Sequence, residues 1–299
     1  MDIAVTGSNG LIGTALGASL RADGHRVVPV VRSGGADDAI QWDPLAGTID
    51  AAGLEGLDAV VHLAGAGIAA GPWTTAQRSR IHDSRSLGTT LLSNTLASLD
   101  QKPAVLVSGS AIGYYGDRGD EVLTESSAPG TDFLAGVCLD WEAPVRVASD
   151  AGTRTAVLRT GVVLDPSGGS LGKQLPAFKL GLGAKAGRGT QWLSWITLRD
   201  EVAAIRHVID HASVTGPVNL TAPNPVTNAQ FTDAVGRALH RPTFLTIPRV
   251  ARHLPFGIGG LVESLLFTSA RVRPTVLEQT GFEFADTELD AALGELLER

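Results

Sequence analysis

Three glycines near the start of the chain constrain its fold more than any other feature. The apolar residues 2–6 lead directly into Gly7, Gly10 and Gly13 at G-x-x-G-x-x-G spacing, and a helical pattern begins at Leu11. Glycines in this strand–turn–helix context permit a tight turn and a close approach of the backbone to a pyrophosphate. The start of the helix supplies free N–H groups and a positive dipole end to the same anion. The sequence therefore predicts a dinucleotide-binding loop, and a tight turn without a ligand is the alternative.

The end of the second expected strand indicates which dinucleotide binds. Residues 26–31 form this strand, and Arg32 and Ser33 follow it. An NAD site normally carries an acidic residue near this position, which accepts hydrogen bonds from the ribose hydroxyls. A guanidinium instead binds a 2′-phosphate and stacks on adenine, whereas an acid would repel the phosphate. Arg32 therefore favours NADP(H), and an ordinary exposed arginine is the alternative.

Composition and charge exclude several classes of protein. The 299 residues carry a formal net charge of −7 and no basic run, which disfavours nucleic-acid binding. Cys138 is the single cysteine, so no intramolecular disulfide forms, and we expect a cytoplasmic protein. The chain begins with a strand rather than a signal peptide, and no apolar run reaches membrane-spanning length. We expect a small-molecule substrate and no membrane partner, while homo-oligomer formation stays open.

Apolar segments and helical patterns alternate over the first 165 residues, which predicts an α/β fold with a doubly wound parallel sheet. We place a dinucleotide-binding domain at 1–165, with its sheet completed by about 193–221, and a smaller C-terminal substrate lobe at 166–299. The expected long helices are 73–98, 133–151 and 200–211, and the expected later strands are 58–67, 104–110, 154–164, 193–196 and 218–221. We expect residues 254–267, which contain Pro255 and three glycines, to form a buried or interface helix.

A glycine-rich stretch at 168–189 opens the expected lobe. Lys173, Lys179, Lys185 and Arg188 are interspersed in it. Such a stretch either holds an anionic substrate, such as a nucleotide sugar, or forms a flexible exposed loop. The sequence leaves both interpretations open.

Several motifs along the chain resemble those of one protein superfamily. Thr6-Gly7-x-x-Gly10-x-x-Gly13, Leu63-Ala64-Gly65, Ser108-Gly109-Ser110 and Tyr115-Gly116 are similar to motifs of the extended short-chain dehydrogenases/reductases, which include nucleotide-sugar epimerases and dehydratases. The closer resemblance is to an atypical branch, the epimerase family proteins, which has its own C-terminal segment. Trp42-Asp43-Pro44, Ser84-Arg85, Trp141-Glu142, Arg159-x-Gly161 and Trp195-Ile196 carry that closer resemblance.

This resemblance implies a Rossmann fold and a set of cofactor-binding positions. With Arg32 added, these positions are Thr6, Gly7, Asn9, Gly10, Leu11, Ile12, Gly13, Leu63, Ala64, Gly65, Arg85 and Val163. Arg85 stands where many relatives have an asparagine and is expected to contact a cofactor phosphate or ribose. A solvated basic residue is the alternative for Arg85.

The resemblance breaks at the expected catalytic helix. Related enzymes have Tyr-x-x-x-Lys there, with a glutamate four residues after the lysine. Aligning that glutamate with Glu142 puts Leu134 at the tyrosine position and Cys138 at the lysine position. Leu134 has no proton to give, and a thiol does not replace a permanent cation. Any catalysis must therefore obtain its proton elsewhere.

Ser110 and Tyr115 are the remaining catalytic candidates. Ser110 stands where the superfamily serine binds the substrate oxygen, and Tyr115 follows the same strand closely enough to act as a substitute proton donor. The alternatives are a serine that bonds backbone and a tyrosine that packs under the sheet edge. We expect no metal site, because His207 and His211 have metal-ligand spacing but no accompanying carboxylate motif.

Two functions from different classes follow from these features. The first is an NADP(H)-dependent oxidoreductase or epimerase-like enzyme with an unusual proton donor, which acts on a nucleotide sugar or another small carbonyl or hydroxyl compound. The second is a catalytically inactive NADP(H)-binding sensor or regulatory protein.

Overall fold

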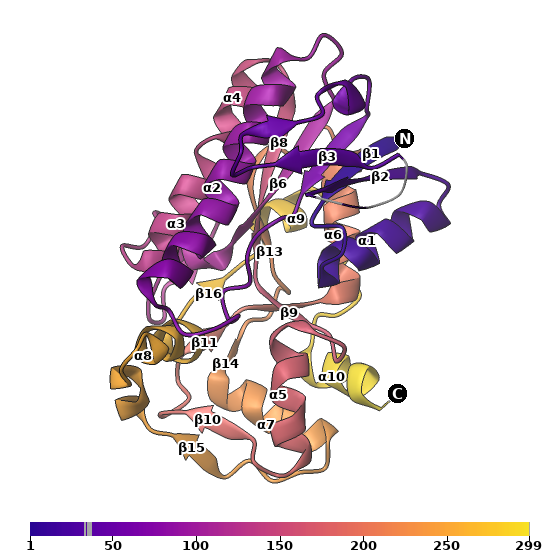
Figure 1. Ribbon diagram of the computed structural model, residues 1–299. Helices are drawn as coiled ribbons and strands as arrows, with labels where there is room; N and C mark the ends of the chain where they lie inside the picture. The colour runs from indigo at the N-terminus through magenta and orange to yellow at the C-terminus, as the bar shows by residue number, and fades with distance from the viewer. Residues whose placement is uncertain (33, 35–37, 299) are drawn as a thin grey trace.

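An eight-stranded, mostly parallel sheet forms the centre of the molecule (Figure 1). The computed structural model describes residues 1–32, 34 and 38–298. In spatial order the strands are β13 (Gly216–Leu220), β8 (Arg154–Thr160), β6 (Val105–Ala111), β5 (Ala59–His62), β1 (Asp2–Thr6), β2 (Arg26–Val31), β3 (Ile40–Asp43) and β4 (Thr48–Ile49). Neighbouring strands are parallel except for the antiparallel pair β3–β4.

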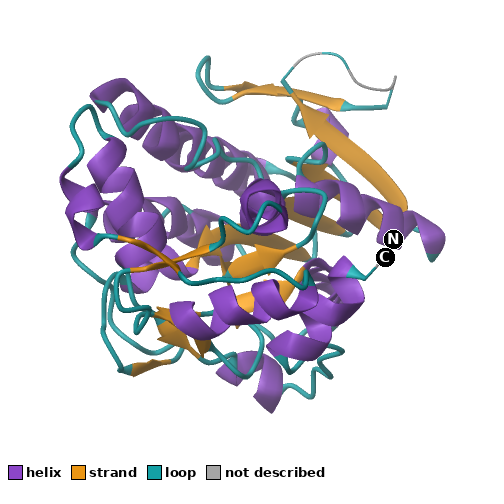
Figure 2. Cartoon of the chain, turned by 90° about the horizontal axis from the view of Figure 1, so that it is seen from below, coloured by secondary structure: helices purple, strands orange, loops and turns teal. Residues whose placement is uncertain are grey.

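The strand order reverses at β1, which lies between β2 and β5. Ligands of such sheets bind at the carboxyl ends of the strands beside this switch point. Helices lie on both sides of the sheet (Figure 2). On one face are α1 (Leu11–Ala22) and α6 (Leu198–Asp210), and on the other are α2 (Thr75–Ser98), α3 (Phe133–Glu142) and α4 (Val145–Asp150). The predicted doubly wound Rossmann fold is confirmed.

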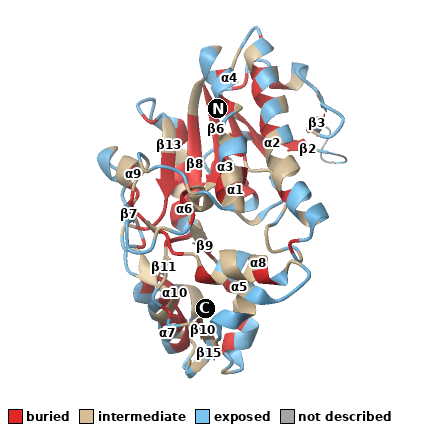
Figure 3. Cartoon of the chain, turned by 90° about the vertical axis from the view of Figure 1, so that its left-hand side faces the viewer, coloured by how far each residue is buried: buried red, intermediate tan, exposed pale blue. Residues whose placement is uncertain are grey.

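The two faces of the sheet belong to two separate hydrophobic cores because successive strand residues point to opposite sides. In β1, Ile3 and Val5 pack against Leu16 of α1, whereas Ala4 belongs to the opposite core, with Leu92 of α2. The central strands are buried along their length (Figure 3). Burial on both faces explains why these strands are continuous apolar runs in the sequence.

A second group of elements lies below the sheet in Figure 1 and has its own apolar core, which includes Phe178, Trp195 and Phe231. Its helices are α5 (Gly169–Lys179), α7 (Asn228–Ala238), α8 (Ile258–Val262) and α10 (Leu289–Leu297). Short strand pairs accompany them: β9 (Val162–Leu164) with β12 (Trp195–Thr197), β10 (Ala184–Ala186) with β15 (Leu245–Ile247), and β11 (Trp192–Leu193) with β14 (Val226–Thr227). Further elements are β7 (Val122–Leu123), β16 (Arg271–Val272), α9 (Thr275–Gln279), η1 (Ala52–Leu54), η2 (Ile112–Tyr115), η3 (Arg249–His253) and η4 (Glu263–Phe267).

Several expected elements differ from the structure. The helix expected at 133–151 is divided into α3 and α4, because Pro144 has no N–H to continue the helical hydrogen bonds. The strand expected at 154–164 breaks at Gly161, where a Cβ would lie 2.8 Å from the carbonyl oxygen of Ser194. Residues 254–267 form only short helical turns rather than one helix. The stretch at 168–189, for which two interpretations were open, forms α5 and β10.

No helix in the described part of the chain is long and apolar enough to cross a membrane.

Candidate functional site

The glycine turn after β1 leaves no room for side chains at two of its three glycines. Gly7 has a φ of +66°, and a Cβ there would lie 2.8 Å from the carbonyl carbon of Leu63. A Cβ on Gly13 would collide with the carbonyl oxygen of Gly7. At Gly10 a Cβ would come within 4 Å of that same oxygen only, at 3.2 Å, so Gly10 is the least restricted of the three. Gly7 and Gly13 therefore hold strand and helix together, while Gly10 leaves space for a ligand.

The start of α1 offers unpaired N–H groups beside this space. Gly10 is the N-cap residue and has no side chain to cap the helix. The N–H of Thr14 donates to the carbonyl oxygen of Gly10 at 2.9 Å, which is the first hydrogen bond of the helix. The preceding N–H groups of Leu11, Ile12 and Gly13 have no partner within the helix. Together, residues 7–13 form what we call the phosphate loop, which has the geometry of an anion site.

Thr6, the last residue of β1, is bonded to the turn that follows β5. It has no exposed surface, and its Oγ1 accepts hydrogen bonds from the N–H groups of Leu63 at 3.0 Å and Ala64 at 3.1 Å. The same oxygen lies 2.7 Å from Nδ1 of His62, whose Nε2 lies 3.1 Å from Thr89 Oγ1. Burial lowers the pKa of His62 to about 4, which keeps the imidazole neutral. Thr6 was predicted as a cofactor-binding residue, and its visible role is to position the turn after β5.

Asn9 and Arg32 are exposed, as are Gly10 and Gly65 of the predicted cofactor set. Asn9 lies in the turn of the phosphate loop. Arg32 directly follows β2 and forms no ion pair or hydrogen bond with the residues that the structure describes. Ser33, which we named beside it, lies outside the described residues. Within the described residues, no side chain or backbone group occupies the guanidinium of Arg32.

Arg85 of α2 is a partly buried cation with no carboxylate partner in the described structure. Its Nη1 donates to the carbonyl oxygens of Ala66 and Ile81, both at 2.9 Å. Its Cζ lies 4.8 Å from the centre of the Trp141 ring, and a Cβ on Gly65 would lie 3.2 Å from it. Burial lowers the pKa of the guanidinium. Arg85 thus contacts the turn after β5 and also lines a neighbouring pocket.

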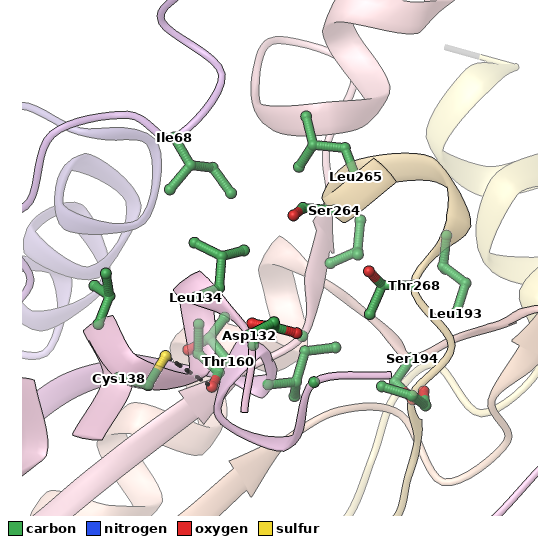
Figure 4. A pocket seen from close by; sticks show the side chains of 18 of the residues that line it. Ile68, Asp132, Leu134, Cys138, Thr160, Leu193, Ser194, Ser264, Leu265 and Thr268 are labelled. Atoms are coloured by element: carbon green, nitrogen blue, oxygen red, sulfur yellow. Dashed lines mark hydrogen bonds between the residues drawn. The ribbon is translucent and has the colours of Figure 1, made fainter. Parts of the chain in front are cut away.

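A pocket of about 270 Å³ lies where the sheet meets the second group of elements. We call it the apolar pocket. Figure 4 shows Ile68 and Leu134 on one side of it and Leu193, Ser264 and Leu265 on the other. Its walls come from the turn after β5, from α2, β6 and α3, from the break between β8 and β9, and from β11, α7 and η4. Only the tertiary structure brings these segments together.

The side chains at the expected tyrosine and lysine positions both line the apolar pocket. Leu134 and Cys138 lie one helical turn apart on α3 (Figure 4). The thiol of Cys138 donates to the carbonyl oxygen of Ala111 at 3.7 Å. Burial, with a smaller effect of the nearby Glu142, raises its pKa to about 12, so Cys138 is a neutral thiol at neutral pH. Neither side chain provides a cation or a ready proton.

Ser110 belongs to a buried ion-pair network behind the pocket. Its hydroxyl donates to Oε1 of Glu142 at 2.6 Å. Arg159 binds the same carboxylate through Nε to Oε1 at 3.0 Å and Nη2 to Oε2 at 2.9 Å. The side chains of Arg159 and Glu142 are only 4% and 14% exposed. Because the hydroxyl of Ser110 donates its one hydrogen bond to Glu142, Ser110 can only accept hydrogen bonds from a ligand.

Tyr115 is held away from the pocket by the same network. It has no exposed surface, and its hydroxyl donates to Oδ1 of Asn219 at 2.6 Å and accepts from Nη1 of Arg159 at 3.1 Å. Burial raises the pKa of Tyr115 to about 12. Tyr114 stacks on the guanidinium of Arg159 at 3.4 Å. The expected proton donor is therefore packed under the sheet edge, which was the alternative considered from the sequence.

Val163, predicted near the cofactor, is half-buried in β9 and pairs with Ile196 of β12. Its neighbour Val162 lines the apolar pocket instead. Successive strand residues point to opposite sides, so the two valines face different surroundings.

A buried carboxyl group adjoins the pocket and was not found from the sequence. Glu201 of α6 has no exposed surface, and its Oε1 accepts a hydrogen bond from Thr160 Oγ1 at 2.9 Å. Its Oε2 has no hydrogen-bond partner among the residues that the structure describes. Burial raises the pKa of Glu201 to about 8. A glutamate in the first turn of a helix looks like an ordinary dipole-stabilising residue in a sequence, and so gave no signal.

The histidine pair and the basic residues of 168–189, which the sequence also singled out, do not line the apolar pocket. His207 and His211 stack on each other at 3.7 Å, and His207 lies 3.0 Å from Thr280 Oγ1. Among the described residues no group of three His, Cys, Asp or Glu side chains is placed to hold a metal ion.

Comparisons with known proteins match nearly the whole chain. A model of the NAD dependent epimerase/dehydratase family matches residues 3–220, and a domain of unknown function, DUF1731, matches residues 249–296. Epimerase family protein Mb2239 of Mycobacterium bovis is 45% identical over 293 residues, which are 98% of this chain and 96% of that protein. Human epimerase family protein SDR39U1 is 35% identical over 301 residues, 99% of this chain and 100% of that protein.

Solved structures agree with these matches. A crystal structure of human SDR39U1 (isoform 2) with NADPH has a TM-score of 0.91 at 35% identity and covers 100% of both chains. The nucleoside-diphosphate sugar epimerase from Corynebacterium glutamicum has a TM-score of 0.81 at 38% identity and covers 99% of this chain and 58% of that one. The chain belongs to the NAD dependent epimerase/dehydratase family, in the branch of the epimerase family proteins.

Proposed function

We propose that this protein binds NADP(H) across the carboxyl ends of β1, β2 and β5 and acts as an oxidoreductase or epimerase-like enzyme on a small carbonyl or hydroxyl compound. The observation that carries the proposal is the phosphate loop. Its outer glycines have no room for a Cβ, a Cβ on its middle glycine would come near one backbone oxygen only, and a helix start without a side-chain cap lies beside it. A cradle of backbone N–H groups is what a pyrophosphate requires.

Particular residues of this chain fit the parts of the cofactor. The N–H groups of the phosphate loop would hold the pyrophosphate, and Arg32, which has no protein partner among the described residues, would bind the 2′-phosphate. Arg85 and the small turn at Leu63–Gly65 lie between the loop and the apolar pocket. When bound, the nicotinamide supplies or accepts a hydride. The human relative crystallised with NADPH supports this choice of cofactor.

The test is a direct comparison of two cofactors. We expect NADPH to bind the full-length protein roughly 10- to 100-fold more tightly than NADH, because a charge-assisted contact to the 2′-phosphate is worth about 1.5–3 kcal/mol. Fluorescence titration of each reduced cofactor measures both affinities. Equal affinities, or binding of neither cofactor, would refute the proposal.

A second candidate function is an NADP(H) sensor without catalysis. It is favoured by Leu134 and Cys138, which stand at the expected tyrosine and lysine positions, and by the enclosed hydroxyl of Tyr115. Turnover of any member of a carbonyl panel by the native protein supports the enzyme. If the native protein is inactive and the double variant Leu134→Tyr/Cys138→Lys gains turnover, the sensor is supported.

A further inference from the structure

The charges around the apolar pocket do not suit a phosphorylated substrate. Its lining contains one cationic side chain, Arg85, and one carboxylate, Asp132. Arg271 stacks on the ring of Trp192 at 4.3 Å but is not part of the lining. Sites for diphosphates normally present several arginines, lysines or backbone N–H groups, because each phosphate must exchange its hydration for charge-assisted hydrogen bonds. A lining with balanced charges offers no such compensation.

Three polar side chains of the lining are already bonded to the protein. Gln191 donates to the carbonyl oxygens of Ala186 at 3.2 Å and Leu266 at 2.5 Å. The hydroxyl of Ser194 donates to the carbonyl oxygen of Ala270 at 2.8 Å, and the hydroxyl of Thr160 donates to Glu201. Groups satisfied in this way present mainly their carbon atoms to a ligand. The pocket is therefore more apolar than its residue types suggest.

The carbon-rich surfaces of the pocket face one another. Leu134 and Ile68 lie across it from Leu193 and Leu265 (Figure 4). Ser264 also points into the space, and its hydroxyl forms no hydrogen bond with any residue that the structure describes. An engineered apolar cavity of about 150 Å³ binds benzene, so a pocket of about 270 Å³ holds roughly one or two rings. Ser264 provides a free hydroxyl for such a compound, and Nε1 of Trp141, also in the lining, has no hydrogen-bond partner among the described residues.

We propose that the apolar pocket takes an uncharged, largely apolar compound of one or two rings that carries one carbonyl or hydroxyl group, rather than a nucleotide sugar. The presence of the carbonyl or hydroxyl rests on the proposed function, whereas the apolar, uncharged character rests on the lining alone. The family-specific C-terminal segment supplies Ser264 and Leu265 and thereby selects the substrate.

Calorimetry with two probe compounds tests this proposal. 2-Decalone, an uncharged bicyclic ketone, and UDP-glucose are each titrated into the full-length protein, with and without saturating NADP⁺. We expect 2-decalone to bind at least about tenfold more tightly than UDP-glucose. Burial of its rings against the carbon-rich lining is favourable, whereas the lining has too few charged groups to replace the hydration that the phosphates of UDP-glucose lose. Tighter binding of UDP-glucose, or binding of neither compound, overturns the proposal.

A pair of variants shows whether binding occurs in this pocket. Leu265→Asp places a carboxylate in the wall, and Leu180→Asp makes the same change at an exposed leucine outside the lining. We expect the first variant to weaken 2-decalone binding at least about tenfold and the second to leave it unchanged. Equal effects of the two variants overturn the assignment of the pocket. Because NADPH affinity is measured in the same samples, a failure of cofactor binding is recognised separately from a failure of the pocket.

Discussion

The phosphate loop and the apolar pocket lie at the same side of the sheet but are constructed in different ways. The loop comes from residues 7–13 alone, and its backbone geometry depends on Gly7 and Gly13, where a Cβ would collide with backbone atoms. The pocket combines segments from Ile68 to Ala270, and the polar side chains of Gln191, Ser194 and Thr160 in its lining bond to the protein. The phosphate loop thus has the general geometry of an anion site, whereas the apolar pocket depends on side chains particular to this chain. A protein of this kind can keep its cofactor while its chemistry changes.

The largest effect is expected at Glu201, the buried carboxyl beside the pocket. Its pKa of about 8 in the folded protein exceeds the usual 4.5, so the unfolded chain loses this proton at lower pH than the folded chain. Stability therefore falls as pH rises from about 4.5 to about 8. Glu201→Gln removes this titration, and the free energy of unfolding of the variant relative to the native protein should rise by about 4 kcal/mol across that range.

Urea unfolding at pH 5, 6.5 and 8 measures this difference. Glu283→Gln, at an exposed position, is the control and should show no such trend. A relative stability of the Glu201 variant that does not change with pH would mean that the carboxyl is ionised in the folded protein.

The next effect separates the two structural roles of the phosphate-loop glycines. Gly13→Ala places a Cβ against backbone atoms of Gly7 and Ser8, and we expect a loss of about 3 kcal/mol in the free energy of unfolding. Gly10→Val adds its side chain at the least restricted of the three glycines, so NADPH binding should be lost while stability stays within about 1 kcal/mol. Urea unfolding and NADPH titration measure both variants. If Gly10→Val keeps full affinity, the loop does not hold the pyrophosphate.

A smaller effect is expected for the charge at the end of β2. Arg32→Glu replaces an attractive contact with repulsion, so the preference for NADPH over NADH should disappear or reverse, a change of roughly 10- to 100-fold. Arg80→Glu makes the same change at another exposed arginine without a protein partner among the described residues, and should keep the preference. If both variants change the preference for NADPH equally, the change comes from the net charge of the protein rather than from a contact between Arg32 and the 2′-phosphate.

The smallest effect is expected at Tyr115. Tyr115→Phe removes the hydrogen bonds to Asn219 and from Arg159, which should cost about 1–2 kcal/mol of stability. Because the hydroxyl is enclosed, turnover of any accepted substrate should change far less than the roughly 100-fold expected on loss of a general acid. A collapse of turnover with normal stability would restore Tyr115 as the proton donor and weaken the contrast between the two regions.

The sequence alone determined the sheet, its doubly wound order and the phosphate loop. These features depend on alternating apolar segments and on glycine spacing, which act over a few neighbouring residues. The same local character let Arg32 be singled out, since the residue after the second strand of such a sheet lies beside the cofactor ribose. The positions of Leu134 and Cys138 came instead from the family resemblance, by aligning the glutamate of its motif with Glu142.

Only the tertiary structure decided where the chemical groups point. Tyr115 was correctly placed after its strand, but the turn of η2 directs it toward Asn219, which is 104 residues away in the chain, and Arg159. The apolar pocket likewise depends on η4 reaching the carboxyl ends of β6 and β8. Such contacts join residues far apart in the chain, and they form through complementary packing and hydrogen bonding that no local pattern records. The physical reason is that a short sequence pattern fixes backbone geometry, whereas burial and the direction of a side chain depend on what packs against it.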